Sequence, residues 1–288
     1  MPSARGYTPL VPADRIAQNL AFINWTLLTG LAVGAYASVV LARTRTGATR
    51  GYLAFTTACA LTFGLLALGS DTVLPAGVLA SSVSTDPSWA EPRRLALGAF
   101  AALVLADLVV LIANRRVPVV GLAGVVSGIA ILVFAALGWG GGVLGAVPLL
   151  VQLLVLAAAT GGVFAAMILG HWYLVTPKLP EAPLVLFGRI LTAVLGLQVV
   201  LFVVWAAVGA GPGGEGRFAI LVGPWALFVW LRLIVGLVFP LIVSWAAVQT
   251  ARTRSMESAT GLLYINVGTI AAGTILAAGL YFGAGLLV

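Results

Sequence analysis

The sequence predicts an all-α polytopic integral membrane protein, a bundle of eight transmembrane helices. Of its 288 residues, 61% are hydrophobic and only 8% are charged, whereas about a quarter of the residues in a soluble domain are charged. The mean hydropathy is +1.14. The apolar residues form runs of about 20 or more, the length that crosses a hydrocarbon core about 30 Å thick. A single transmembrane domain over residues 1–288, with the lipid bilayer as its solvent, is therefore expected.

Eight spans result from dividing the chain at charged residues and at clusters of glycine and proline. Residues 117–177 contain no Lys, Arg, Asp or Glu and are too many for one helix. The glycines of 138–142 divide this run because glycine weakens a helix, and Pro148 favours the first turn of the next one. Pro240 predicts a kink in the seventh span. The predicted spans are about 16–42, 51–70, 95–114, 117–137, 147–173, 184–208, 224–250 and 261–286, with a long outer loop at 71–94.

The lysines and arginines predict the orientation of the bundle, because the cytoplasmic loops of membrane proteins carry an excess of these residues. The loops after the first, third, fifth and seventh spans are basic, whereas acidic residues balance the arginines elsewhere. Both termini are therefore expected outside, in a protein of the cytoplasmic (inner) membrane. The alternative is a cleaved signal peptide, because residues 35–37 resemble a small-residue cleavage site. Three arginines follow the first apolar run and two precede it, which favours an outward N-terminus.

Asp107 and Arg232 are the most informative residues, because a charge inside the hydrocarbon core is costly and needs a partner. Counted from the outer ends of their spans, Asp107 lies about 20 Å deep and Arg232 lies about 12 to 22 Å deep, at about 1.5 Å per residue. These depths permit an ion pair. One interpretation is a structural pair that joins the third and seventh spans. The other is a site for a proton, an anion or a quinone oxygen, in which Arg232 is the favoured ligand contact because its guanidinium stays charged.

His171 is the only histidine in the sequence and lies where the fifth span reaches the inner interface. It is interpreted either as a member of the interfacial aromatic belt or as a proton donor or acceptor beside a quinone headgroup. The sequence also predicts an inner basic rim that would attract anionic lipid headgroups or an acidic partner subunit. The members of this rim are Lys178, Arg189, Arg252 and Arg254.

Neighbouring small residues indicate where helices approach one another. The pair Gly161 and Gly162 in the middle of the fifth span predicts close packing against another helix, in preference to an interrupted helix at a binding site. Eight spans with like-facing ends fit two four-helix halves related by an axis along the membrane normal. The two halves of the sequence have no motif in common beyond their richness in glycine and leucine.

Several chemistries are disfavoured by composition. One cysteine, Cys59, allows neither an intrachain disulfide nor a thiolate metal cluster, and one histidine is too few for a bis-histidine haem or a three-histidine zinc site. The sequence has no Walker motif, nucleophile elbow or HExxH motif. The basic residues are spread between apolar runs, which does not suit nucleic acid. No cofactor held by this chain alone, and no catalytic activity of its own, are expected.

Three functions remain open. The first is an integral membrane subunit of a larger redox or respiratory-type complex that anchors other membrane subunits and contacts quinone or lipid. The second is a secondary transporter or channel for a proton or small anion that uses Asp107 and Arg232. The third is a purely structural membrane scaffold. In topology alone, eight spans with outside termini resemble the membrane anchors of the polysulfide-reductase type, with no motif in common.

Overall fold

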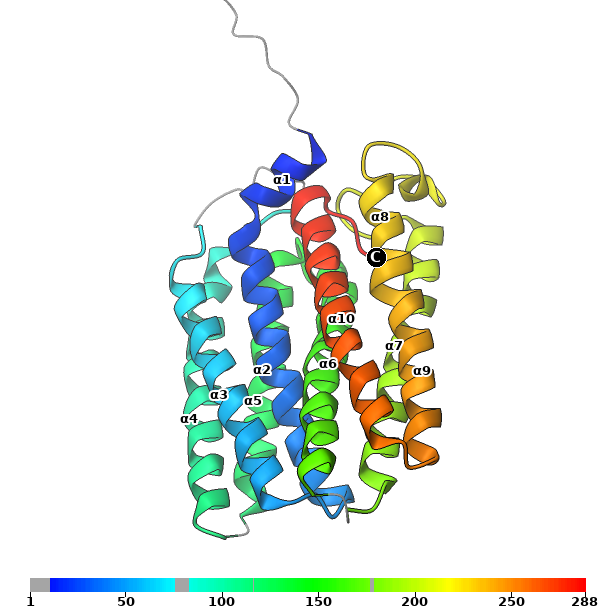
Figure 1. Ribbon diagram of the computed structural model, residues 1–288. Coiled ribbons are helices and arrows are strands. Elements are labelled where there is room, and N and C mark those ends of the chain that lie inside the picture. Colours follow the sequence, from blue (N-terminus) through cyan, green and yellow to red (C-terminus); the bar gives the residue numbers. More distant parts are fainter. Residues whose placement is uncertain (1–10, 76–82, 116, 177–178) are drawn as a thin grey trace, which may run out of the picture.

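The computed structural model describes residues 11–75, 83–115, 117–176 and 179–288, which form a bundle of long helices (Figure 1). In this part of the chain, eight helical stretches are long and apolar enough to cross a membrane, which confirms the predicted all-α membrane bundle. A short helix, α1 (Pro12–Gln18), precedes them. The stretches are α2 (Leu20–Arg45), α3 (Arg50–Thr72), η1 with α4 (Pro87–Trp89 and Ala90–Ile112), α5 (Pro118–Trp139), α6 (Val143–Val175), α7 (Ala182–Val208), α8 with η3 and α9 (Ala226–Leu233, Ile234–Val238 and Phe239–Arg252) and α10 (Met256–Ala284).

Some helix bounds differ from those predicted. The first predicted span is broken at Asn19, whose side-chain amide donates to the carbonyl oxygen of Arg15 at 2.8 Å. The predicted outer loop 71–94 is shorter than expected, because Asp71 belongs to α3 and Arg93 to α4. Pro148 lies inside α6, which begins five residues earlier, at Val143. Charges and prolines therefore mark the neighbourhood of helix ends in this chain but not the end residues themselves.

The eight spans form two four-helix units. Unit one contains α2, α3, α4 and α5, and unit two contains α6, α7, α8 with α9, and α10. Within each unit consecutive spans pack against each other, and the fourth span packs back against the first. The units meet mainly along α2 and α6, with α10 against α2 and α5 against α6. The contact of α10 with α2 corresponds to that of α5 with α6, because each joins the fourth span of one unit to the first span of the other. Two parallel repeats related by an axis along the bundle have this pattern.

Glycine permits the closest contact between the two units. A Cβ atom on Gly34 of α2 would overlap the backbone of Ala157 in α6, and one on Gly161 would overlap the backbone of Gly34 and Ala35. The close packing predicted for Gly161 is therefore confirmed. A Cβ atom on the adjacent Gly162 would meet no atom within 4 Å. One glycine of the predicted pair joins the units, and the other faces open space.

The seventh span contains a π-helical turn, η3, where a kink was predicted. Pro240 has no backbone N–H, so the carbonyl of Gly236 cannot receive the usual bond from four residues further along. That carbonyl accepts a hydrogen bond from Nη1 of Arg232 at 3.3 Å instead. The amide of Asn266 in α10 donates to the carbonyl of Pro240 at 3.1 Å and to Oγ of Ser244 at 2.7 Å. The irregular turn thus contains a carbonyl group that the buried side chain of Arg232 takes up, and Asn266 joins α10 to α9 just beyond it.

The two ends of the bundle differ in charge. The connections α2–α3, α4–α5, α6–α7 and α9–α10 lie together at one end, which is called the basic end below (Figure 1). Helix α1 lies at the opposite end. The described arginines of the basic end are Arg43, Arg45, Arg50, Arg115, Arg252 and Arg254. The basic loops of the sequence are thus gathered at one end, as predicted.

Candidate functional site

Asp107 lies five residues before Ile112, the last residue of α4, and is fully buried near the basic end. Its Oδ1 accepts from Nη1 of Arg43 at 2.8 Å, and its Oδ2 accepts from the hydroxyl of Tyr36 at 3.0 Å. Both partners belong to α2. The ion pair with Arg232, which the predicted depths permitted, does not form: both oxygens of Asp107 have partners in α2, and Arg232 belongs to unit two. Counting depth from the outer end overlooked that Asp107 lies only about 8 Å from the nearer end of its helix, at about 1.5 Å per residue.

Helix α5 makes room for this cluster with glycine. A Cβ atom on Gly121 would overlap Nη2 of Arg43, and one on Gly124 would lie 2.5 Å from Cε1 of Tyr36. The two side chains therefore pack directly against α5, between it and Asp107 of α4. The Asp107 side chain is 0% exposed, whereas that of Arg43 is 18% exposed. Arg43 thus connects the buried carboxylate with the surface of the basic end.

A pocket of about 550 Å³, called the basic pocket below, opens beside Arg43 at the basic end. Arg50 lies at its edge and donates from Nη2 to the carbonyls of Leu111 and Ile112 at 3.2 and 3.3 Å. These carbonyls belong to the last turn of α4, where the helix itself offers no donors. Among the residues that the structure describes, those that line the basic pocket include no Asp or Glu: Arg43, Thr44, Thr46, Gly47, Ala48, Arg50, Leu53, Leu111, Asn114, Arg115, Val117 and Pro118.

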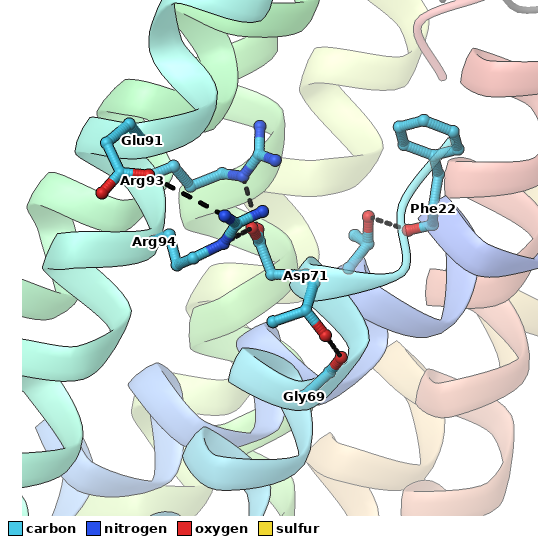
Figure 2. A network of polar contacts seen from close by, with 8 residues as sticks. Phe22, Gly69, Asp71, Glu91, Arg93 and Arg94 are labelled. Atoms are coloured by element: carbon cyan, nitrogen blue, oxygen red, sulfur yellow. Dashed lines mark hydrogen bonds and ion pairs between the residues drawn. The ribbon is translucent and has the colours of Figure 1, made fainter. Parts of the chain in front are cut away.

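A second buried ion pair lies at the other end of unit one (Figure 2). Nε of Arg93 in α4 lies 2.6 Å from Oδ2 of Asp71 in α3, and the two residues are 5% and 1% exposed. The Arg93 guanidinium also lies 4.6 Å from the ring centre of Trp139 and 5.6 Å from that of Trp25. Arg94 adds a longer ion pair to Asp71, at 3.5 Å. One arginine of α4 thereby contacts α2, α3 and α5.

Sequence reasoning missed this second ion pair because it assigned Asp71 and Arg93 to the outer loop. The signal was present: Asp71 directly follows an uncharged run of about 20 residues, and two arginines directly precede the next span. Glu91 lies 3.8 Å from Arg94 and is well exposed, so it marks where the network reaches the surface (Figure 2). A charged residue next to an apolar run can belong to the helix when its charge is paired, so its position in the sequence does not mark the end of the helix.

Arg232 has an equivalent place in unit two. It lies six residues after Ala226, the first residue of its span (232 − 226), as Arg93 lies six residues after Pro87 (93 − 87). The residue is 2% exposed, and Nη2 donates to Oε1 of Gln198 in α7 at 2.7 Å. Nε donates to the carbonyl oxygen of Val288 at 3.4 Å. Each unit thus holds a buried arginine from its third span near the end opposite the basic end.

Replacing Arg232 by lysine is expected to lower the free energy of unfolding by about 1–3 kcal/mol. One ammonium group cannot reach the oxygens of Gln198, Val288 and Gly236 together, so a buried oxygen loses its donor. Thermal unfolding in detergent micelles would measure this loss. The control is Arg217→Lys, at an exposed position of the same end. Equal melting temperatures for the two variants would contradict the contacts of Arg232.

The remaining predicted site residues lie apart from Asp107. His171 is exposed in α6, with Nδ1 3.5 Å from the hydroxyl of Tyr264 in α10. Arg189, Arg252 and Arg254 are exposed, and Nε of Arg254 lies 3.7 Å from Oε2 of Glu181. Lys178, the fourth residue of the predicted rim, lies outside the described residues. The basic pocket is built from arginines other than those predicted for the rim.

Within the described ranges, no group of three or more His, Cys, Asp or Glu side chains is placed to hold a metal ion. Comparison of the chain with protein-family models, curated proteins and solved structures finds no match. The geometry of the buried charges and of the basic pocket is therefore the basis for the functional argument.

Proposed function

We propose that this protein is a membrane-embedded anchor, a subunit that holds other membrane subunits of a larger complex in the bilayer. The supporting observation is the environment of Asp107. Both of its oxygens are taken, one by Arg43 and one by Tyr36, and its side chain is fully buried. A carboxylate in this state fastens α4 to α2 and presents no free face to a ligand. The intramembrane charge then acts as a structural clamp.

The other buried charges support the same proposal. Arg93 is held by Asp71 and by the rings of two tryptophans, and Arg232 is held by an amide oxygen and two carbonyl oxygens. Apart from the bond between Arg232 and Gly236, which lies within one span, these contacts join different segments of the same unit, so they favour a rigid frame. We place the basic end on the cytoplasmic side of the cytoplasmic membrane, because arginines prefer that side. Contact of a quinone with His171 stays a prediction.

The anchor proposal is tested by purifying the protein at its native level from native membranes in a mild detergent, after brief cross-linking. We expect other membrane proteins to elute with it in fixed proportion. A multi-pass protein of unrelated sequence, carried through the same purification, is the control. The proposal would be overturned if the protein eluted alone, or only with proteins that also elute with the control.

Transport of a proton or small anion is the second candidate function. It is favoured by one observation: Arg43 is 18% exposed and connects the buried Asp107 with the basic pocket. The variant Asp107→Asn removes the charge and keeps the shape of the side chain. If the protein transports, pH-driven uptake into reconstituted vesicles should occur and should vanish in this variant. The anchor proposal predicts that neither the natural protein nor the Asp107→Asn variant gives uptake above that of protein-free vesicles.

A further inference from the structure

We propose that the basic pocket binds a phosphate group, carried either by the headgroup of an anionic lipid or by a soluble phosphate. This inference goes beyond the proposed anchor function and does not depend on it. The positive charge of the pocket supports it. Arg43, Arg50 and Arg115 line the pocket, and the described part of its lining contains no carboxylate. Asp107 lies behind Arg43 and neutralises it, so Arg50 and Arg115 supply the net positive charge.

The guanidinium groups suit phosphate because each presents a planar fork of N–H donors that matches two phosphate oxygens. Two of the three are already positioned. Arg43 is held by Asp107 at 2.8 Å, and Arg50 is held by the carbonyls of Leu111 and Ile112. A side chain that is fixed before binding loses less conformational freedom when a ligand arrives. The pocket is thus prepared for an anion.

The turn between α4 and α5 brings the third arginine to the mouth of the pocket. Asn114 has a φ of 56°, in the left-handed region, and the backbone N–H of Arg115 donates to the carbonyl of Val110 at 3.0 Å. This hydrogen bond closes the end of α4 and turns the chain toward α5. Asn114 and Arg115 both line the pocket there.

The position of the pocket also fits a phosphate. It lies between the last residues of α2 and α4 and the first residues of α3 and α5, where four spans end. Lipid headgroups and the aqueous phase meet at this level of a membrane protein. Its volume of about 550 Å³ lies within the usual range for small-ligand sites, about 300–1,000 Å³. Leu53 and Leu111 add an apolar wall that suits the carbon atoms next to a phosphate.

The test uses delipidated full-length protein in a neutral detergent and two probes, short-chain phosphatidic acid and inorganic phosphate. Binding is measured by native mass spectrometry for the lipid and by equilibrium dialysis for phosphate, with a short-chain diacylglycerol, which has no phosphate, as the uncharged comparison. The test variant is Arg50→Gln with Arg115→Gln. The matched control is Arg189→Gln with Arg252→Gln, which removes the same charge from exposed positions outside the pocket.

We expect the pocket variant to bind phosphatidic acid about thirtyfold more weakly, at about 1 kcal/mol for each arginine, and the control to bind nearly as the natural protein does. If the natural protein also binds inorganic phosphate and the pocket variant loses that binding, the site accepts a soluble phosphate as well as a lipid. If the natural protein binds phosphatidic acid but not inorganic phosphate, the ligand is a lipid headgroup. Either result supports the site. Equal weakening in the pocket variant and the control, or binding of neither probe, would overturn it.

Should the double variant not fold, the single variant Arg115→Gln keeps the inference testable, because Arg115 is exposed and is not a member of the buried Arg43–Asp107 pair. About fivefold weaker binding of phosphatidic acid is expected from the loss of one arginine. Unchanged binding in this variant would contradict the participation of Arg115 and with it the three-arginine site.

Discussion

Replacing Arg43 by leucine is expected to lower the free energy of unfolding by about 3–5 kcal/mol, the usual cost of removing one member of a buried ion pair. The reason is the fully buried carboxylate of Asp107, which would keep the Tyr36 hydroxyl as its partner and lose the guanidinium. Leucine is shorter than arginine and replaces only its apolar stem, so the change removes the guanidinium group and its charge. Denaturant unfolding in mixed micelles would measure the difference.

The matched control for this variant is Arg45→Leu. Arg45 ends the same helix, carries the same charge and is exposed. Surface changes of this kind usually alter stability by less than about 0.5 kcal/mol. Equal stabilities for the Arg43 and Arg45 variants would show that the Asp107 carboxylate does not depend on Arg43.

Replacing Gly161 by valine is expected to separate the two four-helix units and to cost at least about 3 kcal/mol, at the upper end of overpacking effects. The new Cβ atom would overlap the backbone of Gly34 and Ala35 in α2, and backbone cannot move aside as a flexible side chain can. Because α2 and α6 form the main contact between the units, the cost falls on the whole bundle. The yield of folded protein and its melting temperature in detergent are the measurements.

The adjacent residue provides the control. Gly162→Val adds the same side chain to the same helix, one residue further on, where a Cβ atom would meet nothing within 4 Å. Its stability should stay close to that of the natural protein, since the helix gains rather than loses from replacing glycine. A Gly162 variant as unstable as the Gly161 variant would mean that the units approach along a different face of α6.

The spans could be predicted from the sequence because the bilayer imposes a length and an apolar composition on every crossing. Helix ends could not be read as reliably. Asp71 and Arg93 fall in the loop predicted at 71–94, yet both lie within helices and neutralise each other. A charge next to a span has two ways to avoid the hydrocarbon core, facing water or pairing with another charge. Composition does not distinguish them.

The partner of Asp107 could not be predicted because helical rise gives depth along a span and says nothing about which spans are neighbours. Asp107 and Arg232 belong to different units. Arg43 was counted as a loop arginine that sets the orientation of the chain, and an arginine in that role looks the same in sequence as one that turns inward. The glycines at 121 and 124 carried the missing information, since they leave room on α5 for Arg43 and Tyr36.

The hydrogen-bond acceptors of Arg232 also could not be predicted from the sequence. Gln198 is neutral, and the Gly236 carbonyl is freed only because Pro240 follows four residues later. The proline was visible in the sequence and was interpreted as a kink. Its consequence for a buried arginine depends on the π-helical turn that places Gly236 beside the guanidinium.

Two double-mutant cycles at Asp107 test most directly whether the buried charges fasten helices within a unit. One cycle combines Arg43→Leu with Asp107→Leu, and the other combines Arg232→Leu with Asp107→Leu, with unfolding free energies measured in the same micelles. Contact between Arg43 and Asp107 predicts a coupling of at least about 2 kcal/mol in the first cycle and less than about 0.5 kcal/mol in the second. No coupling in the first cycle, or strong coupling in the second, would contradict the clamp.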